Sequence, residues 1–160
     1  MSYDLLALPV PPGAEIEEAG EALSVRLAGG HVYADASPAA AARRRALAEV
    51  VADADPALAP VAAAPQGRIA LSDDGGLRVH VTERFMSFHV AYAGGGRAAA
   101  DIFARLFRVA GAALRETGWR LYDPQGACGV EADDDGREAT LELYLSVVDQ
   151  LLPGRDDAAR

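Results

Sequence analysis

The residues from Met86 to Gln125, MSFHVAYAGGGRAAADIFARLFRVAGAALRETGWRLYDPQ, decide the fold class of this chain. They predict a strand over 86–92, then a glycine loop and a long helix over 97–117. Gly118 ends that helix, and a second strand follows over 119–122. The helix prediction rests on an apolar stripe at helical spacing: Ile102, Phe103, Leu106, Phe107, Ala110, Ala113 and Leu114. The stretch is therefore one β-α-β unit, and it contains no complete catalytic or cofactor motif.

The remaining chain predicts an α+β fold. Hairpins join the middle strands, whereas helices connect the others, so the expected order is β-α-α-β-β-β-α-β-α. We predict a ferredoxin-like antiparallel sheet with an extra edge strand and helices mainly on one face. The polar face of the middle strands would then stay open. The other expected elements are strands over 3–8, 68–71 and 77–82, helices over 14–27, 37–54 and 137–152, and an Ala/Pro-rich linker over 56–66.

Composition narrows the classes of function. The chain has 160 residues, a hydrophobic content of 51% and a formal net charge of −9. We expect one domain over residues 1–152 and a polar C-terminal tail over 153–160. The sequence pI of about 4.7 argues against nucleic acid and anionic membranes as partners, because both are bound by basic surfaces.

Residue usage excludes several chemistries. All 15 basic residues are arginine, so a lysine nucleophile is excluded. The abundance of arginine, alanine and glycine is typical of GC-rich codon usage and indicates a bacterial source. One cysteine, Cys128, excludes an intrachain disulfide and a cysteine-cluster metal site. No secretion signal or membrane-spanning stretch is predicted, so we expect a cytoplasmic protein. Because the sequence contains no complete cofactor motif, we also expect no cofactor.

Two short motifs carry a family resemblance. The chain starts with Ser2-Tyr3-Asp4-Leu5, and its amphipathic helix leads through Thr117-Gly118 to Tyr122-Asp123-Pro124-Gln125. In these features it resembles a group of small, uncharacterised bacterial proteins, over roughly half of its length. The resemblance implies a similar fold. It implies no activity and no catalytic residues, because none is established for the group.

The first candidate site is the histidine pair His80 and His89. A tight turn centred on Arg84 and Phe85 would place the two rings directly opposite each other on the polar face. A register slip of two residues would keep the shared face and make the rings diagonal neighbours. Two histidines and a carboxylate, for which Asp4 is the candidate, can hold a divalent metal. The alternative, which we favour, is a half-buried or exposed polar pair on an open sheet and no metal site.

Two further candidates lie at the ends of predicted strands. Backbone N–H groups of Gly94-Gly95-Gly96 together with Arg97 can hold an anion at the start of a helix. The stretch lacks the spacing of a phosphate or dinucleotide loop, and a flexible connection is the structural alternative. Asp123 can act as a base or ligand, or it can cap the turn that follows it.

The sequence leaves two functions open. We favour a non-enzymatic cytoplasmic protein that binds a protein partner or a second copy of itself, as in a homodimer. The other hypothesis is a small-ligand- or metal-binding enzyme that uses the open sheet face with His80, His89 and Asp123.

Overall fold

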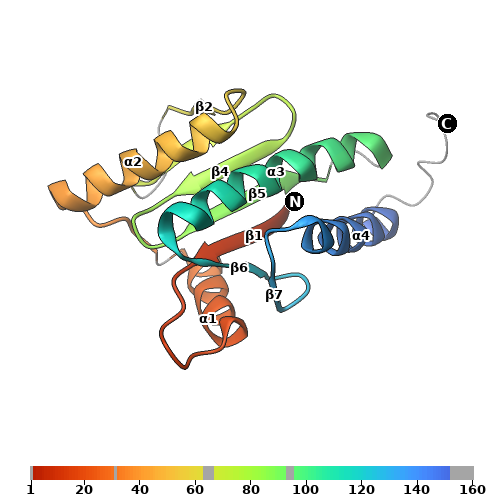
Figure 1. Cartoon of the computed structure of the whole chain (residues 1–160), viewed down its shortest axis with the longest axis horizontal. Coiled ribbons are helices and arrows are strands. Elements are labelled where there is room, and N and C mark those ends of the chain that lie inside the picture. The colour runs from red at the N-terminus through yellow and green to blue at the C-terminus, as the bar shows by residue number, and fades with distance from the viewer. Residues whose placement is uncertain (1, 31, 63–66, 93–95, 152–160) are drawn as a thin grey trace.

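The computed structural model describes residues 2–30, 32–62, 67–92 and 96–151 (Figure 1). Within these residues the strands form one seven-stranded sheet of order β2-β3-β4-β5-β1-β6-β7, and every neighbouring pair is antiparallel. The strands are β1 Ser2–Leu8, β2 Ala59–Pro60, β3 Ile69–Ser72, β4 Leu77–Val81, β5 Met86–Ala91, β6 Arg120–Asp123 and β7 Cys128–Val130. The helices are α1 Ile16–Ala28, α2 Pro38–Ala54, α3 Gly96–Thr117 and α4 Asp134–Leu151. The architecture is therefore α+β, and the tail predicted for 153–160 lies outside the described residues.

The larger core lies between the sheet and three helices. The alternating apolar residues of β4 and β5 all face this core, and so do Tyr3, Leu5 and Ala7 of β1. Helix α3 contributes its apolar stripe, which includes Phe103 and Leu106, both fully buried. Helices α2 and α3 lie side by side over this face, and α4 packs against α3 (Figure 1). The side chain of Tyr144 brings α4 into the same core.

Helix α1 lies on the other face of the sheet. It packs on β6 and β7 and joins a smaller apolar cluster with Leu6 and Leu8 of β1. Strand β1 is therefore apolar along most of its length because both of its faces are covered there. Gly20 lets α1 approach closely, since a Cβ at this position would lie 2.3 Å from the ring of Tyr122. In the part of the chain that the structure describes, no helix packs on the rest of this face, over β4, β5 and the start of β1 (Figure 1).

Two short strands differ from the sequence prediction. The linker expected over 56–66 contains β2, which pairs with β3 through Ala59 and Pro60; residues 63–66 lie outside the described part. Strand β7 was not predicted and adds Cys128–Val130 to the edge beside β6. Both strands have two or three residues, too few to produce the alternation on which a strand prediction rests.

The predicted register of the β4–β5 hairpin is wrong by two residues. His80 pairs with Ser87, and Arg78 pairs with His89. The turn is centred on Glu83 and Arg84 because Thr82 and Phe85 close it. The Thr82 hydroxyl accepts the backbone N–H of Phe85 at 2.9 Å and donates to its carbonyl at 2.8 Å.

A tertiary contact also holds that turn. The Glu83 carboxylate accepts a hydrogen bond from Arg44 of α2 at 2.8 Å and one from the backbone N–H of Asp35 at 3.0 Å. Burial raises the pKa of Glu83, whereas the hydrogen bond from Arg44 lowers it. The net effect is a pKa below the ordinary value. Sequence spacing alone contains no information on this contact.

Candidate functional site

The open face is the uncovered polar side of β1, β4 and β5, which carries Ser2, Asp4, Arg78, His80 and His89. The prediction that the histidine rings share one face is confirmed. Their ring centroids lie 4.8 Å apart with an interplanar angle of 57°. The strands supply this arrangement because residues two apart on a strand, or diagonal across a pair, point to the same side.

His89 is held at both ring nitrogens. Its Nδ1 lies 2.7 Å from Oδ1 of Asp4, and its Nε2 lies 2.9 Å from the hydroxyl of Ser87. The Ser2 hydroxyl donates a further hydrogen bond to Asp4 at 2.7 Å. Ser87 was not among the predicted site residues, although its spacing of two from His89 on one strand indicates the shared face. The ring of His89 is therefore fixed in orientation by its neighbours.

His80 differs from His89 in its surroundings. Its ring makes no hydrogen bond or ion pair with any described residue. Burial lowers the pKa of His80 to about 4, and the nearby His89, Arg68 and Arg78 act in the same direction. Asp4 acts weakly in the opposite direction. His80 is thus neutral at pH 7, with one ring nitrogen able to donate and the other able to accept a hydrogen bond.

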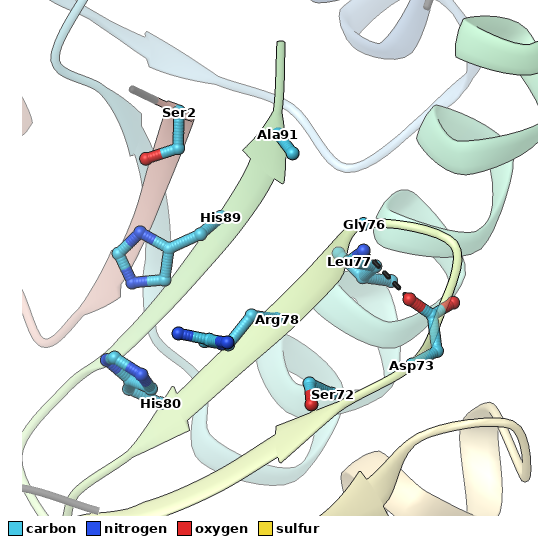
Figure 2. Close-up of a pocket in the computed structure, with 9 residues that line it drawn as sticks. All are labelled: Ser2, Ser72, Asp73, Gly76, Leu77, Arg78, His80, His89 and Ala91. Atoms are coloured by element: carbon cyan, nitrogen blue, oxygen red, sulfur yellow. Dashed lines mark hydrogen bonds between the residues drawn. The ribbon is translucent and has the colours of Figure 1, made fainter. Parts of the chain in front are cut away.

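Two hollows open beside the histidines, and both include His80 and His89 in their walls. The first, of about 350 Å³, lies towards the β3–β4 turn (Figure 2). In Figure 2 the Arg78 side chain extends across it, between the two histidines. The second, of about 360 Å³, lies towards α1 and includes Arg68 and Ser87. Each hollow is large enough for a side chain or a small metabolite.

The structure does not place Asp123 with the histidines. Asp123 is 2% exposed and faces the helix-covered core, on the other side of the sheet from His80. Its carboxylate accepts hydrogen bonds from the backbone N–H groups of Gln125 at 2.8 Å and Gly126 at 3.1 Å, and from the hydroxyl of Tyr3. Asp123 therefore cannot act together with the histidines as the enzyme hypothesis requires, because strand alternation turns its side chain inward. Its contacts with Gln125 and Gly126 are those of a residue that caps the following turn.

Arg97 is exposed on the first turn of α3. It lines neither of the hollows that contain the histidines. Gly94 and Gly95 of the predicted anion loop lie outside the described residues, so that loop stays a prediction. Arg97 is thus separate from the open face.

Among the residues that the structure describes, no group of three or more His, Cys, Asp or Glu side chains is placed to hold a metal ion. In the same residues, no helix is both long and apolar enough to cross a membrane. No protein-family model, curated protein or solved structure matches the chain. The resemblance to a bacterial group therefore stays a prediction, and the function must be argued from the site.

Proposed function

We propose that this protein acts without catalysis, by binding another protein on its open face. The observation that carries the proposal is a pair of polar side chains, Arg78 and His80, beside solvent-open hollows. Neither side chain makes a hydrogen bond or ion pair with a described residue, whereas the neighbouring His89 is satisfied on both sides. A partner can therefore bind these two groups without breaking a contact within the protein.

The two edges of the sheet support a face rather than an edge as the binding surface. At one edge, β2 has only two residues, and its Pro60 has no N–H to donate. At the other edge, the backbone N–H of Gly129 in β7 donates to the carboxylate of Glu17 at 3.1 Å. Both features oppose the addition of a strand from a second chain. Three helices fill the covered face of the sheet, so the open face is the part of the sheet that a partner can reach.

Charge favours a different protein over a second copy. Arg68 and Arg78 both lie close enough to lower the pKa of His80. Two copies facing each other about a two-fold axis through this surface would bring their basic groups together, which opposes association. A homodimer through this face is therefore the weaker of the two binding hypotheses.

Site-specific photo-cross-linking tests the proposal in the cells that produce the protein. A benzophenone amino acid would replace Ser72, which lines the first hollow and is partly exposed, and, as the control, the exposed Arg108 on α3. We expect one discrete adduct from position 72, absent from position 108 and lost when His80→Asp is added. Mass spectrometry of the adduct separates another protein from a second copy. The same products from both positions, or none from position 72, would contradict the proposal.

One observation favours a small-ligand enzyme as the second candidate. Ser87, His89 and Asp4 form a hydrogen-bonded chain in the order of a nucleophile, a base and an orienting carboxylate. Since an ionised carboxylate only accepts, Nδ1 of His89 donates to Asp4 and Nε2 accepts from Ser87. We rank this function second because Ser87 is 1% exposed. A fluorophosphonate probe would label Ser87 in an enzyme and leave a binding protein unlabelled, with Ser87→Ala as the control.

We further propose that the inner strands are ferredoxin-like and that the protein works in the cytoplasm. The order β4-β5-β1-β6, with helices linking β1 to β4 and β5 to β6, supports the first statement. Strands β2, β3 and β7 would then be additions at the two edges. The single cysteine, which leaves no intrachain disulfide, supports the second statement.

A further inference from the structure

We infer that the open face takes a carboxylate side chain from an acidic segment of its protein partner, held between Arg78 and His80. This inference rests on the proposed function and names the chemistry of the partner. The groups that recognise the carboxylate are the guanidinium of Arg78 and an N–H of the neutral His80 ring. Both can donate to the same anion, because both line the first hollow (Figure 2).

The charge balance of the open face favours an anion. The guanidinium groups of Arg68 and Arg78 lower the pKa of His80, whereas the carboxylate of Asp4 raises it. Asp73 also lines the first hollow, but it forms an ion pair with Arg105. The chain as a whole has a net charge of −9. The open face is thus a locally basic region on an acidic protein. It attracts an acidic segment of a partner, whereas the negative charge of the remaining surface repels that segment.

The fixed ring of His89 shapes this site. Asp4 and Ser87 occupy both of its ring nitrogens, so His89 presents a ring face to its neighbour and leaves no donor for a ligand. Oδ1 of Asp4 is similarly occupied, by His89 and Ser2. Arg68 has its own contacts, with the carbonyl of Val32 at 3.0 Å and the ring of Phe85. The anion is therefore bound by Arg78 and His80, while His89, Arg68 and Asp4 influence the electrostatic potential at the site.

Binding of a carboxylate is linked to a proton. The groups that face His80 are His89, Arg68, Arg78 and Asp4, and together with burial they keep its ring neutral at pH 7. A bound carboxylate adds one negative charge beside the ring and raises the pKa of His80. By linkage, protonation of His80 strengthens binding as the pH falls, until the carboxylate of the ligand is itself protonated near its ordinary pKa of about 4.3.

An NMR titration of the whole protein tests the inference. The probes are acetyl-Gly-Glu-Glu-Gly-amide, its Gln-Gln counterpart and inorganic phosphate. We expect the Glu peptide to shift the ring signals of His80 with a Kd on the order of 1 mM, and to raise the pKa of His80 above about 4. Arg78→Gln should weaken this binding at least about fivefold. Arg108→Gln, at an exposed arginine on α3 with no assigned binding role, is the matched control and should leave it unchanged.

Several outcomes would overturn the inference. Equal binding of the Gln peptide would show that charge does not select the ligand. An unchanged Kd in Arg78→Gln, or no shift at His80, would remove the site. Phosphate binding without peptide binding would replace an acidic protein segment with a small anion.

The cross-linking experiment and the NMR titration can give a negative result independently, so failure of the inference can be told apart from failure of the proposed function. A cross-link from position 72 without peptide binding leaves the open face as a docking surface for a partner of another chemistry. Peptide binding without any cross-linked protein leaves an anion site and removes the protein partner.

Discussion

The hydroxyl of Tyr3 donates a hydrogen bond to the carboxylate of Asp123 in the buried core, and this contact joins the start of β1 to the end of β6. Tyr3 and Asp123 belong to the two short sequence motifs Ser2-Tyr3-Asp4-Leu5 and Tyr122-Asp123-Pro124-Gln125. A second contact links the motifs, because the backbone N–H of Asp4 donates to the side-chain oxygen of Gln125 at 3.2 Å. We infer that these motifs hold two neighbouring strands together.

Replacement of Tyr3 by phenylalanine should destabilise the protein by about 1–3 kcal/mol. The variant leaves the buried carboxylate of Asp123 with one donor fewer, while the ring and its contacts with Phe103 and Tyr144 are kept. Urea unfolding at pH 7 measures the loss. Tyr33→Phe is the matched control, because Tyr33 is 67% exposed, and it should change stability by less than about 0.5 kcal/mol. Equal stabilities of the two variants would mean that the buried hydrogen bond contributes nothing.

The same hydroxyl should make stability fall at alkaline pH. Burial raises the pKa of Tyr3 above its ordinary value of 10.0, and the hydrogen bond to Asp123 raises it further. The unfolded chain therefore releases this proton first, so the contribution is fully present below pH 10 and is lost as the pH rises above it. Unfolding measured at pH 9 and 11 should show a smaller loss in Tyr3→Phe than in the wild type. An identical loss would assign the alkaline effect to other groups.

His80 should make stability fall in weak acid. Its pKa is about 4 in the folded protein, below its ordinary value of 6.5. The unfolded chain binds this proton first as the pH falls, so stability is present above pH 6.5 and is lost between there and about 4. Solvent screening limits the loss to about 1–3 kcal/mol. Urea unfolding of His80→Gln should lose less stability between pH 7 and 4.5 than the wild type. Parallel curves would show that burial of this ring is overstated.

Two glycines in helices should respond to alanine with opposite signs. At Gly20 a new Cβ would lie 2.3 Å from the buried ring of Tyr122, so Gly20→Ala should destabilise by about 1–3 kcal/mol despite its better helix propensity. At Gly111 the nearest atom is the end of the flexible Arg115 side chain at 3.4 Å. Gly111→Ala should therefore stabilise by about 0.5–1 kcal/mol. Thermal unfolding compares them, and a stabilised Gly20→Ala would show that α1 does not pack closely on β6.

Leu106→Ala should cost about 2–5 kcal/mol, because Leu106 is fully buried between α3 and the sheet and the change leaves a cavity. Val25→Ala on α1 is the control for loss of apolar atoms at an exposed site, since Val25 is 67% exposed. It should change stability by less than about 0.5 kcal/mol. A loss below about 1 kcal/mol for Leu106→Ala would place the apolar stripe of α3 outside the core.

The elements that the sequence predicted correctly have strong local signals. The stripe over 97–117 repeats through several turns, and the alternation over 77–82 and 86–92 assigns each side chain to a face without reference to the rest of the chain. The start of α2 was also predictable, because Ser37 caps it by accepting the N–H of Ala40 at 3.3 Å. For the same reason the shared face of His80 and His89 was predictable.

Contacts between distant segments decided the remainder. The register of β4 and β5 depends on a turn that Thr82 closes and that Arg44 of α2 holds through Glu83. The inward direction of Asp123 depends on the pairing of β6 with β1. A sequence pattern indicates which residues share one face of a helix or strand. It does not indicate which residue of the neighbouring strand lies opposite each of them.

Some features of the open face were determined by the sequence alone, and others by contacts between distant segments. Sequence determined that β4 and β5 each have a polar side with a histidine, and it excluded a lysine nucleophile and an intrachain disulfide. Tertiary structure decided that Asp4 and Ser87 hold His89, that Arg78 and His80 remain available, and that α1 covers only part of this face. The physical reason is that hydrogen bonding and burial depend on distances between atoms that chain separation does not determine.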